Sequence, residues 1–243
     1  MPPSVELSDD GRPARAPLSL VSLDHPLVVS AGTAGTLVAA YLTWFRFGRR
    51  VRTVDDLRAA DYSPRRLRGT VVRCGDADNF RFFHLPLFRP FLRPARTRTG
   101  LAGQTLHVRL AGVDAPELPH FGKPEQPFAR EALGLLTKTL QGKRVVVELY
   151  QKDRYGRVVG HAYVRRFPFF RRRSVSEIML EAGYATVYRQ AGAVYGGKGA
   201  LDRLTALEAA ARSQRRGMWA LGNQLELPAD FKRRLREKEA KPP

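Results

Sequence analysis

Residues 109–117 read RLAGVDAPE, and this stretch gives the strongest indication of the fold. The residues that lead into it alternate with a period of two, which places three apolar side chains on one face of a strand: Leu106, Val108 and Leu110. Arg109 falls on the other face, and Asp114 and Glu117 follow directly after the apolar strand. The stretch therefore predicts a buried strand with one arginine in it and two carboxylates just beyond its end.

The sequence on both sides of this strand predicts an α+β domain. Two strands joined by an acidic turn are expected within 67–83, and a hairpin with Gly156 in its turn is expected over 144–150 and 158–164. Amphipathic or capped stretches predict helices over 127–140, 174–183 and 199–217. A five-stranded barrel with three helices against it satisfies this order, whereas an open sheet would leave edges that a short domain must cover.

Charged residues also stand in two other turns. Asp76 and Asp78 lie in the turn of the first strand pair, and Arg157 ends the hairpin tip KDRYGR. Each has a structural explanation when taken alone, because Asp–Ala–Pro is a common turn and an aspartate in a turn bonds its own backbone.

Taken together, the motifs resemble those of staphylococcal nuclease-like domains. The runs GDADNF (75–80), RLAGVDAPE (109–117) and DRYGR (153–157) match three motifs of that family in order and spacing, and RRGMW resembles its last helix and Trp. The resemblance covers residues 67–221, interrupted by a Pro/Arg-rich insertion at 84–103. With the uncharged run described below, the chain looks like the fungal membrane-bound, mitochondrial branch of these endonucleases.

The resemblance implies an OB-type β-barrel and Ca²⁺-dependent hydrolysis of phosphodiester bonds in DNA or RNA. Residue by residue, it implies a catalytic trio of Arg109, Glu117 and Arg157. It also implies metal ligands from the carboxylates of Asp78 and Asp114 and from the backbone carbonyl of Ala115. The chain departs from the family at Ala115, where Thr is frequent, and at Ala77, where Gly is common. The family places aromatic side chains beside the site, which makes base-stacking candidates of Tyr184, Tyr188 and Tyr195; each is equally compatible with a core or surface tyrosine.

The chemistry agrees with these roles. Phosphodiester hydrolysis builds negative charge on phosphorus, and oxygen ligands suit a hard dication such as Ca²⁺. Arginine offers paired donors to phosphate oxygens, which lysine lacks. Glu117 can accept a proton from the attacking water.

Composition sets broader limits. The net charge is +19; residues 1–45 carry −2, so the remainder carries +21. A charge of this size is compatible with a polyanionic partner, either nucleic acid or an acidic membrane surface. It is equally compatible with a basic surface that is simply solvated, so the charge alone does not decide between these alternatives. The arginines of the insertion (Arg89, Arg93, Arg96 and Arg98) fit the same three alternatives. The single cysteine, Cys74, excludes an intramolecular disulfide and a thiolate zinc site.

An uncharged run precedes the domain. Residues 26–45 contain no charged side chain, and four arginines follow within seven residues. Twenty residues rise about 30 Å as a helix, which matches the hydrocarbon core of a bilayer. We therefore expect a transmembrane helix over 26–47, with the N-terminus outside and the nuclease domain on the cytosolic or matrix side. A buried core helix and an uncleaved signal peptide are the alternatives.

The remaining boundaries follow. We expect a disordered N-terminus over 1–25, a linker over 48–66, the nuclease-like domain over 67–221 and a charged tail over 222–243. Two rival functions stay open. One is a catalytically inactive nucleic-acid-binding module, and the other is a structural membrane tether that uses its basic face on anionic lipid. Neither rival needs carboxylates directly after a buried strand.

Overall fold

The computed structural model describes residues 26–62, 65–95, 97–119, 122–166 and 171–240. The chain divides into two compact units, Met1–Arg46 and Phe47–Pro243. The predicted disorder of 1–25 concerns residues outside the described part.

The first unit contains helix α1 (Pro26–Thr43), and a short π-helix, η1 (Trp44–Gly48), follows it in the sequence. Apolar side chains along the described part of α1 are exposed, among them Leu37, Val38, Tyr41 and Leu42. Among the residues that the structure describes, no helix combines the length and the apolarity needed to cross a membrane. The transmembrane helix predicted over 26–47 is therefore not confirmed.

The second unit is built on a closed barrel. Strand β1 (Arg66–Asp76) pairs antiparallel with β2 (Asn79–His84) on one side and with β5 (Arg144–Lys152) on the other. Strand β2 pairs with β3 (Leu106–Leu110), and β5 pairs with β6 (Val158–Arg166). A parallel pairing between β3 and β6 closes the ring. This closure removes the sheet edges, and it confirms the predicted five-stranded barrel.

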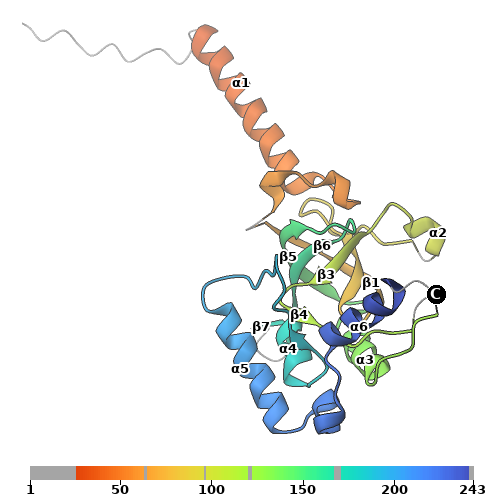
Figure 1. Ribbon diagram of the computed structural model, residues 1–243. Coiled ribbons are helices and arrows are strands. Elements are labelled where there is room, and N and C mark those ends of the chain that lie inside the picture. Colours follow the sequence, from red (N-terminus) through yellow and green to blue (C-terminus); the bar gives the residue numbers. More distant parts are fainter. Residues whose placement is uncertain (1–25, 63–64, 96, 120–121, 167–170, 241–243) are drawn as a thin grey trace, which may run out of the picture. The chain divides into compact units, whose positions relative to one another are not determined.

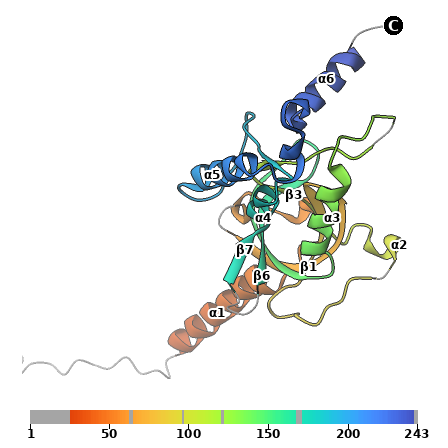
Figure 2. The ribbon, with the colours of Figure 1, turned by 90° about the horizontal axis from the view of Figure 1, so that it is seen from below.

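Smaller elements extend the barrel. Strand β7 (Arg171–Ser174) adds to β6, and β4 (Val113–Asp114) pairs with β8 (Thr186–Val187) in a separate two-stranded sheet. The predicted helices are α3 (Ala129–Leu140), α4 (Val175–Glu181) and α5 (Ala200–Ser213). The view from below in Figure 2 shows the strands as a ring, with α3 and α5 on opposite sides of it.

The core fills the barrel and the space beneath the helices. The burial of β3 alternates as its sequence predicts, with Leu106, Val108 and Leu110 inside. Other side chains with almost no exposure include Phe80, Phe82, Leu136, Leu149, Met179 and Leu180. Burying side chains of this size stabilises the fold by about 1.5–3 kcal/mol each before the entropy cost is counted, so the barrel is a rigid platform for the residues at its rim.

The predicted linker over 48–66 is packed against the barrel. It contains two 3₁₀ turns, η2 (Val54–Asp56) and η3 (Ala59–Asp61), and Val51 and Val54 are buried. The backbone N–H of Val51 donates to Nδ1 of His84 over 2.9 Å. Two valines do not make a periodic pattern, which is why the sequence read as a linker.

The predicted charged tail over 222–243 is also structured. The 3₁₀ segment η4 (Gly217–Gln224) leads into helix α6 (Pro228–Ala240). Phe231 of α6 is buried, and Nε2 of Gln126 donates to the carbonyl of Glu226 over 2.7 Å just before the helix. In Figure 1, α6 is the dark blue helix that leads to the C-terminus, and Figure 2 shows it running away from the ring of strands. The insertion likewise contains a short helix, α2 (Arg98–Leu101).

Candidate active site

Three charged side chains meet at the end of β3. Nη2 of Arg109 lies 2.9 Å from Oδ1 of Asp114 and 3.2 Å from Oδ2 of Asp78. Both aspartates are buried. The arginine thus bridges two carboxylates that stand 36 positions apart in the sequence.

Strand pairing brings these residues together. Asn79 of β2 is the register partner of Arg109, and the backbone N–H of Leu110 donates to the carbonyl of Asp78 over 2.8 Å. The chain then turns at Gly112, whose φ of +74° is left-handed, a conformation that favours glycine. A Cβ there would also lie 2.8 Å from Cδ1 of Leu204. This turn places Asp114 on β4, where it pairs with Thr186 of β8.

Glu117 is held by a loop rather than by a strand. Its backbone N–H donates to Oε1 of Gln126 over 3.3 Å, and its carbonyl accepts from the backbone N–H of Gln126 over 2.9 Å. The carboxylate is 31% exposed and can therefore meet water.

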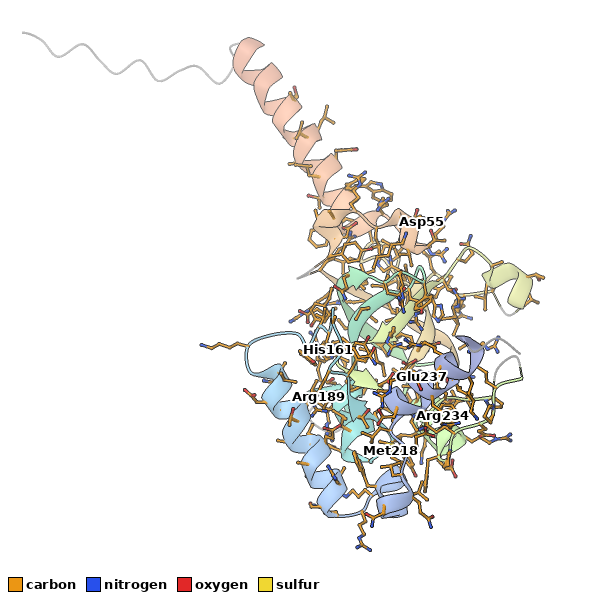
Figure 3. All side chains as sticks on the ribbon, in the orientation of Figure 1. Asp55, His161, Arg189, Met218, Arg234 and Glu237 are labelled. Atoms are coloured by element: carbon orange, nitrogen blue, oxygen red, sulfur yellow. The ribbon has the colours of Figure 1, made fainter. Side chains whose placement is uncertain are left out.

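A residue that the sequence analysis missed completes this cluster. Nζ of Lys232, on α6, lies 2.7 Å from Oδ1 of Asp114 and 2.5 Å from Oε1 of Glu117. One feature of the sequence could have indicated that this segment packs on the domain. Phe231 is an isolated aromatic residue in a charged segment, and in the structure its side chain is buried. Figure 3 labels Arg234 and Glu237, which mark the next turns of α6.

Arg157 is fixed at the tip of the β5–β6 hairpin. Asp153 accepts from the backbone N–H of Arg157 over 2.8 Å and from its Nε over 2.7 Å. Asp153 belongs to the DRYGR motif, but its orienting role was not predicted. Arg157 and Arg109 line one open cleft of about 780 Å³, together with Tyr155, Tyr188 and the backbone of 190–194.

The three tyrosines have different surroundings. Tyr188 lines the cleft, and the guanidinium of Arg109 lies 5.3 Å from the centre of its ring. The hydroxyl of Tyr195 donates to the carbonyl of Tyr188 over 2.6 Å, so Tyr195 supports Tyr188 from behind. Tyr184 packs against the core with Phe128 beside it. Of the three, only Tyr188 is among the residues that line the cleft.

The charges of the cluster change the titration of its members. Burial opposes ionisation of Asp78, but the nearby charges of Arg109, Lys232 and Arg157 outweigh it and hold the pKa of Asp78 below its usual range. Burial also works against the charged form of Lys232, yet Asp114, Asp78 and Glu117 raise the pKa of this ammonium. For Asp76, the charge of Lys232 is too weak an influence to outweigh burial. Burial, together with the charges of Asp78 and Glu117, raises the pKa of Asp76 to about 6.

Oxygen atoms at this site are possible ligands for Ca²⁺. Within the described residues, no three Asp, Glu, His or Cys side chains form a group that could hold a metal ion on their own. The buried Oδ2 atoms of Asp78 and Asp114 nevertheless accept no hydrogen bond from any described residue, although Oδ2 of Asp78 forms the 3.2 Å ion pair with Arg109. Two such carboxylate oxygens suit a hard cation whose remaining ligands are a backbone carbonyl and water. The residues fit the ion, with Lys232 as a competing cation beside it.

Comparisons with known proteins agree with this arrangement. The family described as "Staphylococcal nuclease homologue" matches residues 107–221, which include Arg109, Asp114, Glu117 and Arg157. The chain is 46% identical over 222 residues to the "Probable endonuclease LCL3" of Clavispora lusitaniae, which covers 88% of this chain and 94% of that protein.

Two other proteins with the same name are similar over comparable lengths. That of Candida tropicalis is 41% identical, over 89% of this chain and 94% of the relative. That of Schizophyllum commune is 41% identical, over 85% of this chain and 74% of the relative. A closed barrel, the motif residues gathered at its rim and this degree of identity lead to one assignment: the chain belongs to the staphylococcal nuclease-like family.

Proposed function

We propose that this protein is an endonuclease that hydrolyses phosphodiester bonds of nucleic acid with the help of Ca²⁺. The observation that carries the proposal is the joint placement of Arg109 and Arg157 on one cleft, with Asp78 and Asp114 in ion pairs with Arg109 and with Glu117 linked to Asp114 through Lys232. The relatives are named as probable endonucleases, and the net charge of +19 favours a polyanionic substrate.

The two arginines bind and polarise the scissile phosphate. Each guanidinium has N–H groups left over after its carboxylate contacts, since Arg109 uses Nη2 and Arg157 uses Nε. These two arginines line a cleft whose other lining residues include Lys152, Arg154 and Tyr188. Donors fixed in advance on an oxygen that gains charge typically contribute on the order of 10²–10³ in rate each.

Glu117 acts as the general base. Its partly exposed carboxylate accepts a proton from a water molecule while the water oxygen forms a bond to phosphorus and the bond to the leaving oxygen breaks. Lys232 forms an ion pair with the same carboxylate, so Glu117 must exchange this contact for one to water before it can act.

Asp78 and Asp114, with the carbonyl of Ala115, are the residues that would hold Ca²⁺. When bound, this ion supplies positive charge that stabilises the negative charge developing on phosphate. The chain's own contribution is to surround both buried carboxylates with positive charge, because Arg109 contacts Asp78 and Asp114, and Lys232 contacts Asp114.

The experiment uses the full chain and its Glu117→Ala variant with single-stranded DNA and RNA, in Ca²⁺ or in chelator. We expect cleavage that requires Ca²⁺ and that falls by about 10²–10⁴ in the variant. Equal cleavage by both proteins would refute the role of Glu117. Tight binding of nucleic acid without any cleavage would refute the enzyme and favour the inactive binding module.

We further propose that residues 26–47 attach the protein to a membrane, with the nuclease domain on the positive-inside face and a mitochondrial location. The uncharged run, the four arginines after it and the exposed apolar side chains of α1 support this proposal. Alkaline extraction of membranes from cells that express the full chain tests it. Complete release into the supernatant would contradict attachment by a spanning segment.

A further inference from the structure

A second basic region lies away from the cleft, under the insertion. A groove of about 260 Å³ is walled by β1, the start of β5, the end of β6 and β7, and by the first residues of the insertion. Four of its lining residues are arginines: Arg68, Arg144, Arg165 and Arg172. None of the described residues that line it is acidic, so the groove is suited to an anionic group.

The insertion that walls this groove carries exposed apolar side chains. Leu87 is 54% exposed, Phe88 51% and Phe91 89%, and all three belong to the insertion. Arg89 and Arg93, also exposed, alternate with them. Exposed apolar groups gathered in one place are unusual on a soluble surface and mark a contact with a partner or a membrane.

The insertion is fastened in this position. The backbone N–H of Leu85 donates to the carbonyl of Arg68 over 2.8 Å, and Nη2 of Arg144 donates to the carbonyl of Pro90 over 3.3 Å. The backbone N–H of Leu87 donates to the carbonyl of Phe47 over 2.9 Å. Phe47 is 45% exposed and is the first residue of this unit. The apolar side chains thus stand where the chain enters the domain after the uncharged run 26–45.

The groove and the cleft lie at opposite ends of one hairpin. The groove is lined by 144–146 of β5 and by Tyr163 and Arg165 of β6, whereas the cleft is lined by 151–157 at the hairpin tip. Four residues of β5, 147–150, lie between the two, which puts about 16 Å from Val146 to Gln151 at roughly 3.3 Å per residue. The residues that line the groove and those that line the cleft do not overlap.

We propose that the insertion and the groove beneath it form a docking face for the surface of an anionic phospholipid bilayer. The arginines bind headgroup phosphates through paired N–H donors, and Leu87, Phe88 and Phe91 enter the interface. A lipid surface explains the combination better than nucleic acid does, because the aliphatic Leu87 and the prolines of the insertion cannot stack on bases.

The test places a fluorescent probe at the tip of the insertion. Cys74 is the sole cysteine and is buried, so the full chain with Phe91→Cys can be labelled selectively with an environment-sensitive dye. The labelled protein is mixed with vesicles of phosphatidylcholine alone or with added phosphatidylglycerol. We expect a blue shift that is several-fold larger on the anionic vesicles. The same dye on the control Thr205→Cys, an exposed position of α5, should not shift.

A second pair of proteins tests the arginines. Arg165→Gln with Arg172→Gln should remove the preference for anionic vesicles, whereas Lys198→Gln with Arg203→Gln, which removes the same charge on the side of α5, should leave it unchanged. All four side chains are exposed, so the fold is retained. An equal shift on neutral and anionic vesicles, or a shift produced by an oligonucleotide and not by vesicles, would overturn the proposal. None of these readouts depends on catalysis, so their outcome is separate from that of the nuclease assay.

Discussion

The arginines of the cleft and those of the groove under the insertion differ in whether they form ion pairs. At the cleft, Arg109 and Arg157 are each tied to carboxylates, and their side chains are only 17% and 16% exposed. At the groove under the insertion, Arg68, Arg144, Arg165 and Arg172 are exposed, and no described carboxylate lies within ion-pair distance of them. Paired arginines hold one geometry, as catalysis on a single phosphate requires. Unpaired arginines keep their freedom and suit a surface of many similar headgroups.

The largest effect is expected at Arg157. Lysine keeps the charge but cannot donate to Asp153 and to phosphate through a planar fork, so Arg157→Lys should lose nearly as much activity as Arg157→Ala, on the order of 10²–10³ in kcat. The matched change at the groove, Arg165→Lys, should leave kcat unaltered. Wild-type activity in Arg157→Lys would show that the cleft, like the groove, needs only the positive charge of its arginines.

A smaller loss is expected at Asp153, which orients Arg157 without reaching the phosphate. Asp153→Asn keeps an oxygen for the turn but weakens the ionic bond to Nε of Arg157, and we expect kcat to fall by about tenfold. If Asp153 acts only through Arg157, the same change in an Arg157→Ala background should have almost no further effect. An additive loss in this double-mutant cycle would contradict the positioning role.

Two titratable groups that line neither the cleft nor the groove, His84 and Asp76, should make the stability depend on pH with opposite signs. Burial, followed by the charges of Arg65, Arg50 and Arg49, lowers the pKa of His84 to about 3, and its Nδ1 accepts from Val51. Between pH 6.5 and 3 the unfolded chain therefore binds a proton that the folded protein does not. The stabilisation from His84 is complete above pH 6.5 and is lost on acidification by about 1.4 kcal/mol per pH unit.

Asp76 should change the stability in the opposite direction. Because its pKa in the folded protein is about 6, its contribution to the free energy of unfolding is largest below pH 4 and becomes smaller as the pH rises to 6. Urea unfolding between pH 4 and 7 should show a flatter slope of stability in His84→Gln and a steeper one in Asp76→Asn. Identical slopes in both variants and the wild type would contradict both assignments.

The smallest effect is expected at Lys232. Its ammonium lies on Oδ1 of Asp114, where it competes with a dication, so Lys232→Met should tighten Ca²⁺ binding by about fivefold. Isothermal titration of Ca²⁺ measures this directly, without any substrate. Lys238→Met, on the exposed side of the same helix, is the control. Weaker binding in Lys232→Met would instead make the lysine a support of the metal site.

The sequence predicted the barrel and the arginines of the cleft because both depend on local patterns. The period of two in β3 places Arg109 opposite three buried side chains, and the motifs around Asp78, Asp114 and Arg157 stand in turns that the strands determine. Lys232 could not be predicted in this way, because 118 residues separate it from Asp114. His84 and Val51 are likewise joined by a contact that no periodicity reveals.

Helix α6 bears on where the domain ends in the sequence. The family match ends at residue 221, yet the charge that contacts Asp114 and Glu117 comes from residue 232. A fragment that stops at the family boundary would leave Asp114 without one of its two cations and would expose the apolar surface that Phe231 covers. The folded domain therefore extends beyond residue 221 and includes α6, and a tag meant to leave the site intact belongs beyond that helix.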